Sequence, residues 1–246
     1  MRPAWWLALA GAVLSAPAAQ GACQPARFKV AVDVGHHRAA PGATSAGGAS
    51  EFTYNLRLAE TVSAALAGAG FSARFLIGGS GNPIALEERT RQAVAAGAAL
   101  FLSLHHDSVQ PHYLSTWQVG GADQRYSDRF RGFSVFVSDL NRQARESRAF
   151  GAMLGEALLA RGMTPSLHHA EPIPGENRPL LDARLGLYRF DGLAVLRTAT
   201  MPAVLLEAAV IVNRDEEAQV RSGLVASRVA AAAVQAVREF CAGLPG

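Results

Sequence analysis

The stretch Val30-Ala31-Val32-Asp33-Val34-Gly35-His36-His37 decides how the rest of the chain is interpreted. The β-branched and apolar residues at 30–34 predict a buried strand. Gly35 supplies a turn, and two histidines follow it. Open α/β sheets build their sites at the carboxyl ends of such strands. We therefore expect a functional site around His36.

The rest of the chain alternates between strand-like and helix-like segments. Apolar runs predict strands at 28–34, 71–77, 100–105 and 132–138, with two short ones at 193–197 and 203–207. Helical periodicity predicts helices at 51–68, 84–98, 143–161 and 215–240. Residues 107–131 and 163–191 are irregular, and we expect them to be functional loops beside a groove. This alternation predicts a single α/β domain whose parallel sheet carries helices on both faces.

Composition and charge limit the function classes. The chain has 246 residues, 50% of them hydrophobic and 17% charged, which is enough for one sizeable core and argues against disorder. The net charge is only +3, without a long basic run, so we expect no nucleic-acid partner.

The N-terminus has the layout of a secretory signal peptide. Arg2 precedes an apolar run over 4–14 that is too short to span a bilayer, and small residues follow. We expect a signal peptide over 1–22, cleaved within 18–22, and a mature domain over 23–246 without a membrane span. A retained anchor is the alternative.

The two cysteines, Cys23 and Cys241, lie at the two ends of this mature domain. Export permits a disulfide, and domain termini often lie close together. A terminal disulfide and two unrelated thiols both remain open. Two cysteines so placed do not indicate a cysteine-based zinc site.

Four residues stand where a predicted strand ends or a helix begins: His36, Glu51, His105 and Glu207. Two imidazoles and one carboxylate form a catalytic zinc set that leaves the fourth position to water. The remaining carboxylate can then act as a base toward that water.

Each of these residues also has a plainer interpretation. Glu51 suits the positive end of a helix dipole, and a histidine after a strand is often a turn residue. The pairs His36-His37 and His105-His106 raise a question of register, since neighbours in a strand point to opposite faces. One member of each pair is expected to be a ligand, and spacing leaves open which one.

The ordered motifs resemble a known family. They are Asp33-Val34-Gly35-His36, Glu51-Phe52-Thr53-Tyr54-Asn55, Ser103-Leu104-His105-His106-Asp107-Ser108, Pro202-Ala203-Val204-Leu205-Leu206-Glu207 and Asn213-Arg214-Asp215-Glu216. In this order they resemble the zinc-dependent N-acetylmuramoyl-L-alanine amidases of the type 3 class, which are bacterial cell-wall hydrolases. The resemblance covers essentially the whole mature chain.

This resemblance implies a mostly parallel, twisted sheet of about six strands. It implies Zn²⁺ held by His36, Glu51 and His105, with Glu207 as the catalytic residue. The implied reaction is hydrolysis of the amide between N-acetylmuramic acid and L-alanine of peptidoglycan, in cell-wall remodelling or daughter-cell separation. The implied location is the periplasm.

The chain departs from the family pattern beside the predicted metal. The usual D-P-G-H-G-G is here Asp33-Val34-Gly35-His36-His37-Arg38, and His106 stands where the family usually has Ala. We expect His37, His106 and Arg38 either to orient a ligand or to touch the substrate.

Peptidoglycan is the expected partner of a monomeric enzyme, and a protein activator is a further candidate. The alternatives are another zinc hydrolase of the wall, such as a peptidase or a deacetylase, or an inactive wall-binding regulator. A periplasmic binding protein is disfavoured, because such proteins have two lobes and the sequence contains no segment that would form the second one. Reaction products discriminate the enzymes from one another.

Overall fold

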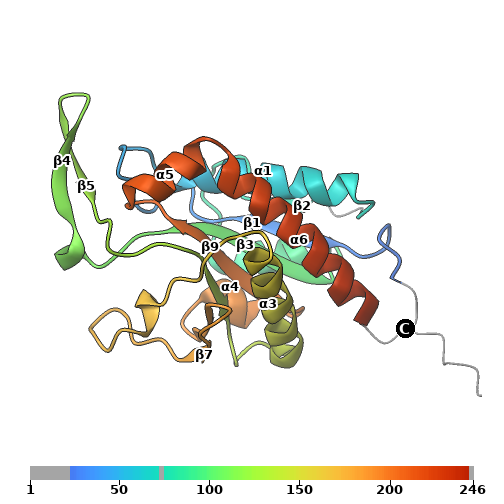
Figure 1. The fold of residues 1–246 in the computed structure, drawn as a ribbon. Helices are drawn as coiled ribbons and strands as arrows, with labels where there is room; N and C mark the ends of the chain where they lie inside the picture. The colour runs from blue at the N-terminus through green and yellow to red at the C-terminus, as the bar shows by residue number, and fades with distance from the viewer. Residues whose placement is uncertain (1–22, 72–74, 244–246) are drawn as a thin grey trace, which may run out of the picture.

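A seven-stranded sheet runs through the centre of this computed structural model, which describes residues 23–71 and 75–243. The strand order is β2-β1-β3-β9-β6-β8-β7 (Figure 1). The strands are β1 Val30–Val34, β2 Phe75–Ile77, β3 Leu100–Asp107, β6 Ser134–Val137, β7 Leu180–Asp182, β8 Leu187–Arg189 and β9 Ala203–Val210. The predicted signal peptide lies outside the described residues.

The half of the sheet that contains the first strand is parallel. Strand β1 pairs in parallel with β2 and β3, and β3 pairs in parallel with β9. Strand β6 then runs antiparallel to β9. The prediction of a mostly parallel α/β sheet is confirmed, with seven strands in place of about six, because the segment 163–191 contributes β7 and β8.

Helices cover both faces, as expected (Figure 1). They are α1 Glu51–Gly68, α2 Leu86–Ala95, α3 Ala144–Leu159, α4 Ala194–Thr198, α5 Arg214–Arg221 and α6 Leu224–Gly243. Helices α1, α3 and α6 pack on one face, where Leu58, Leu154 and Val229 join the larger core. Helices α2 and α4 cover the other face through Ala93 and Leu196.

Three predictions of local structure need correction. The apolar run at 193–197 is wrong as a strand, because it forms α4, which packs Val195 and Leu196 against the sheet. The helix predicted over 215–240 is two helices, separated at Gly223, which has a φ of +82°. The irregular segment 107–131 contains a projecting hairpin, β4 Ser115–Val119 and β5 Ala122–Tyr126 (Figure 1).

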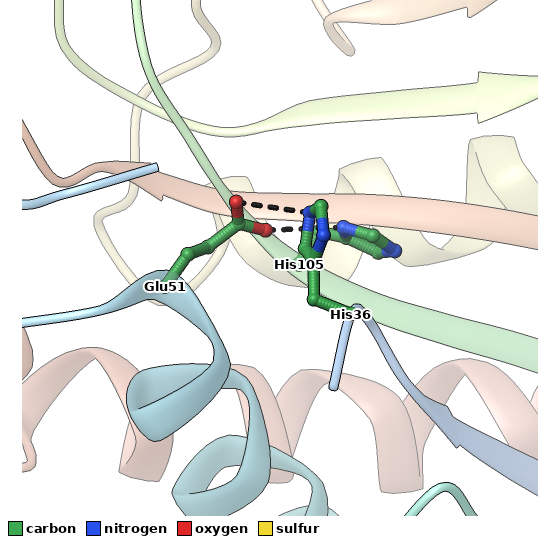
Figure 2. Close-up of side chains that lie close together, drawn as sticks. All are labelled: His36, Glu51 and His105. Carbon is green, nitrogen blue, oxygen red and sulfur yellow. Dashed lines mark hydrogen bonds and ion pairs between the residues drawn. The ribbon is translucent and has the colours of Figure 1, made fainter. Parts of the chain in front are cut away.

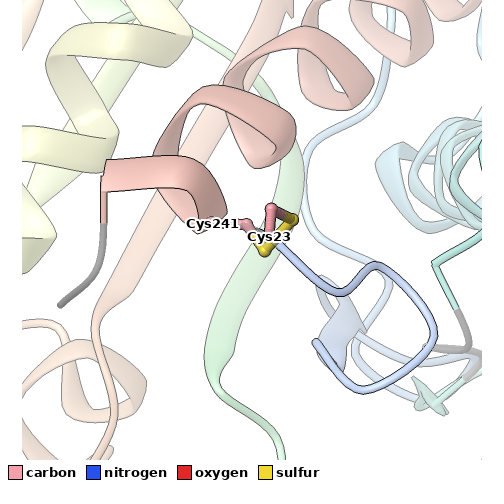
Figure 3. Close-up of a disulfide and its surroundings, with 2 residues drawn as sticks. All are labelled: Cys23 and Cys241. Carbon is pink, nitrogen blue, oxygen red and sulfur yellow. A yellow bond between two sulfur atoms is a disulfide. The ribbon is translucent and has the colours of Figure 1, made fainter. Parts of the chain in front are cut away.

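A disulfide joins Cys23 to Cys241 (Figure 3). It ties the segment before β1 to the last turns of α6, with 218 residues of sequence separation between the two cysteines. Of the two arrangements left open by the sequence, the structure therefore has the terminal disulfide. None of the helices within 23–71 and 75–243 has the length and hydropathy that a membrane span requires.

Candidate functional site

Three of the four predicted residues meet at the carboxyl edge of the parallel strands. Oε2 of Glu51 lies 3.0 Å from Nε2 of His36, and Oε1 lies 3.1 Å from Nδ1 of His105. Figure 2 shows one carboxylate, at the start of α1, facing both imidazoles. One ligand atom from each residue falls within 4.8 Å of the others, so the three can bind a common ion.

Two glycines make room for this cluster. A Cβ at Gly35 would lie 2.4 Å from the imidazole of His105, and a Cβ at Gly42 would lie 2.2 Å from Oε2 of Glu51. His36, between them, adopts a φ of +66°, which costs a residue other than glycine about 1–2 kcal/mol. The cluster is therefore built by close approach of the backbone to its side chains, with backbone strain at His36.

A buried ion pair holds the backbone of His36 in place. Nη1 of Arg89, on α2, lies 2.6 Å from Oδ1 of Asp33 at the end of β1, and Nη2 donates to the carbonyl of His36. Ser103 donates to the other oxygen of Asp33 at 2.7 Å. Both partners of the ion pair are almost fully buried, so removing either one would leave an uncompensated charge.

Glu51 makes more hydrogen bonds than an acid needs if its only role is to stabilise the start of a helix. It is buried, and the backbone N–H of Ala43 donates to Oε2 at 3.0 Å. Nδ2 of Asn55, one turn later, donates to Oε1 at 3.0 Å. Burial by itself would raise the pKa of Glu51, but hydrogen bonds with His105 and His36 outweigh it and hold the pKa well below its usual range. Glu51 therefore presents a carboxylate to the cluster.

The alternation of side chains along β3 separates the two adjacent histidines. His105 faces the cluster, whereas His106 is buried and its Nδ1 lies 2.8 Å from Oδ1 of Asn55. Burial lowers the pKa of His106 to about 4, so the ring is neutral at pH 7 and can donate to that amide oxygen. His106 thus contacts Asn55, which in turn contacts Glu51. The geometry suits a role in orienting a ligand, through one intermediate residue.

The other two candidates, His37 and Arg38, lie at the mouth of the site. Nδ1 of His37 accepts from the backbone N–H of Ala40 at 3.2 Å. The guanidinium of Arg38 donates to the carbonyl of Ser80, in the turn after β2. Arg38 is exposed, whereas His37 borders the neighbouring cavity.

Glu207 lies beside His105 on the adjacent strand. The β3–β9 register pairs the two residues directly, and paired residues of neighbouring strands point to the same face. Oε2 of Glu207 is buried and has no hydrogen-bond partner among the described residues. Burial, together with the negative charges of Asp107 and Glu51, raises the pKa of this carboxyl well above its usual range. A buried carboxyl oxygen left without a hydrogen bond is destabilising and calls for a functional explanation.

An apolar cavity of about 420 Å³ opens next to the two histidines of the cluster. It lies between the sheet and the starts of α2 and α4. Its lining includes His36, His37, His105, Ile84, Leu86 and Leu193. A ligand bound there would have its apolar parts on the helices and its polar end at the cluster.

Comparison with known proteins adds the family to this geometry. The model of the N-acetylmuramoyl-L-alanine amidase family matches residues 30–239. The chain belongs to this family. As an amidase it hydrolyses the bond between N-acetylmuramic acid and L-alanine of peptidoglycan. A comparison with curated protein sequences found no match.

Solved structures share the fold of this amidase. The N-acetylmuramyl-L-alanine amidase Ami1 from Mycobacterium smegmatis is 20% identical, with a TM-score of 0.66 over 88% of this chain and 98% of that one. The catalytic domain of the amidase CwlV from Bacillus (Paenibacillus) polymyxa var. colistinus is 24% identical, with a TM-score of 0.61 over 87% and 97%. The CwlD amidase from Clostridioides difficile, solved in complex with the GerS lipoprotein, is 14% identical, with a TM-score of 0.62 over 87% and 98%.

Two residues of the amidase site escaped the sequence-based prediction of roles. Arg89 lies in a predicted helix whose charged residues resemble an ordinary solvated face, and no local pattern marks it as buried. Asn55 stands four residues after Glu51, a spacing that places two helical side chains side by side and could have indicated their contact.

Proposed function

We propose that this amidase is zinc-dependent, with His36, Glu51 and His105 as the metal ligands and Glu207 as the general base. The observation that carries the proposal is Oε2 of Glu207, a buried carboxyl oxygen without a hydrogen bond, on the strand next to His105. A dedicated base must lie near the reacting atoms without being consumed by a structural contact.

The donor set fits zinc. Two imidazole nitrogens and one carboxylate oxygen are a common ligand set of catalytic zinc, which keeps one position open. Gly35 and Gly42 leave the space in which the three side chains converge. A bound zinc ion supplies Lewis acidity toward the amide carbonyl and toward the attacking water.

The chain's own residues then carry the proton. Glu207 accepts a proton from the attacking water and later delivers it to the nitrogen of L-alanine, which leaves as an amine. The raised pKa of Glu207 helps the second step, because it brings the pKa of the proton donor closer to that of the amine leaving group. Asn55 and Arg89 orient Glu51 and His36, so that the site is organised before substrate arrives.

The setting of the reaction forms part of the proposal. We infer a signal peptide over 1–22, a mature catalytic domain over 23–246 and action in the periplasm. The disulfide supports export, because such bonds persist in oxidising compartments. We propose a monomer, whose activity in wall remodelling is open to control by a protein partner. The fold-level likeness to an amidase solved with a lipoprotein supports such a partner.

The test is a digest of purified peptidoglycan by the mature protein with zinc, with products identified by mass spectrometry. We expect wild type to release stem peptides that begin with L-alanine. Glu207→Gln should retain zinc but lose about 10²–10⁴-fold in rate. Cleavage within the peptide or loss of acetyl groups would indicate a peptidase or a deacetylase, and full activity of Glu207→Gln would remove Glu207 from its role.

A further inference from the structure

A second group of potential metal ligands lies outside the proposed catalytic site. It consists of Asp107 at the end of β3 and of His168 and His169, which open the short 3₁₀ helix His168–Ala170. Nε2 of His169 lies 2.8 Å from Oδ2 of Asp107, and Nε2 of His168 lies 3.3 Å from the same oxygen. The group shares no residue with the first cluster.

The outer nitrogen of each imidazole is already engaged. Nδ1 of His168 lies 2.8 Å from Oγ of Ser166, and Nδ1 of His169 lies 2.8 Å from Oε2 of Glu176. Histidines that bind metals typically use one nitrogen for the ion and give the other to a carboxylate or another acceptor. Both rings therefore direct Nε2 inward and are fixed from outside.

The independent observation is the state of His168. Its side chain is only 2% exposed, and its Nε2 forms no hydrogen bond within the described part of the chain. The ring nitrogen faces Asp107 at a direction that does not make a hydrogen bond, although the distance would permit one. A buried polar atom aimed at a carboxylate without bonding to it is explained by a ligand between them.

Without a metal, the cluster would carry a net charge and would lack one hydrogen bond. In that case His169 would be the cation between the carboxylates of Asp107 and Glu176, and Nε2 of His168 would remain without a hydrogen bond. Two carboxylates and one imidazolium carry one net negative charge in a largely buried place. A divalent cation between neutral imidazoles makes the same group neutral, which low-dielectric surroundings favour.

We propose that Asp107, His168 and His169 form a second site for a divalent transition metal, with zinc as the ion to test. Two imidazole nitrogens disfavour Mg²⁺ and Ca²⁺, which prefer oxygen ligands, and favour zinc or a neighbouring first-row metal. The ion connects the segment 163–179 to β3, two residues beyond the proposed ligand His105.

The test measures bound zinc per chain, by elemental analysis of untagged protein dialysed after loading. We expect two equivalents in wild type and one in each of the single variants His168→Ala and His36→Ala. The double variant should bind none. His112→Ala is the matched control, because His112 is exposed on the neighbouring 3₁₀ turn and belongs to neither cluster, and it should retain two.

One equivalent in wild type together with none in His36→Ala would overturn the proposal. Should His168→Ala fail to fold, the His36→Ala protein decides alone. There, zinc should bind and raise the thermal midpoint, because an ion that binds only the native state stabilises it. An unchanged midpoint with no zinc retained would again refute the second site, while leaving the first site and the proposed amidase mechanism intact.

Discussion

Replacing Gly42 with alanine tests whether the proposed metal ligands depend on close backbone approach. The new Cβ would lie 2.2 Å from Oε2 of Glu51 and 2.7 Å from Cδ2 of His36, whereas ordinary contacts begin at 3.4 Å. The carboxylate must therefore move by about 1 Å, a displacement that can cost about 10²-fold in turnover. The φ of +77° at this position adds about 1–2 kcal/mol of backbone strain.

Gly162→Ala is the matched control for this experiment. Its φ of +71° imposes nearly the same strain, but nothing lies within 4 Å of the added Cβ. Both variants should lose stability in urea denaturation through the backbone strain that they share, and Gly42→Ala should lose more because of its contacts with Glu51 and His36. Only Gly42→Ala should lose peptidoglycan hydrolysis, by about 10²-fold, and zinc affinity in a competition assay with a chelating dye. Equal zinc affinity and activity in the two variants would refute the argument that Gly42 makes room for the cluster.

Three further results are expected. Replacing Cys23 and Cys241 with serine should cost about 5 kcal/mol, because the disulfide closes a loop with a sequence separation of 218, and calorimetry should show a thermal midpoint about 10–20 °C lower. In metal-free protein, Glu207→Gln should have a larger free energy of unfolding in urea than wild type at pH 8, but not at pH 4. The reason is that a carboxyl whose pKa is raised in the native state destabilises that state only as the pH rises above the unfolded pKa of 4.5. Asn55→Ala, which removes a donor to Glu51, should weaken zinc binding about 10–100-fold by the same dye competition, and unchanged affinity would contradict its orienting role.

The sequence predicted the part of the fold that has strong periodicity. The strand at 30–34, the helix that opens at Glu51 and the strand that delivers His105 all lie as expected, because apolar runs and helical spacing reflect burial directly. The run at 193–197 failed for the same reason, since a short apolar segment looks alike as a buried strand or as one turn of helix. The strands β7 and β8 have only three residues each, too few for a period to show.

The candidate site was predictable only as far as its motifs extend. Each of His36, Glu51 and His105 ends a strand or begins a helix, so the topology of a parallel sheet brings them to one edge. The pairing of Asp107 with His169 spans 62 residues and depends on the path of the loop at 163–179, which no local pattern encodes. The partners of Arg89 were hidden for a similar reason, because its contacts lie on β1 and in the turn after it.

The direct pairing of His105 with Glu207 has a consequence for how the chain can vary. All proposed metal ligands of the catalytic site come from the first 105 positions, whereas the proposed proton carrier comes from position 207. Retention of the metal and speed of turnover are therefore encoded in separate stretches, which meet at the site across two adjacent strands. A survey of substitutions should divide accordingly. Changes around β1, α1 and β3 lose metal and rate together, and changes around β9 slow an enzyme that still holds its metal, so the two traits can be selected independently.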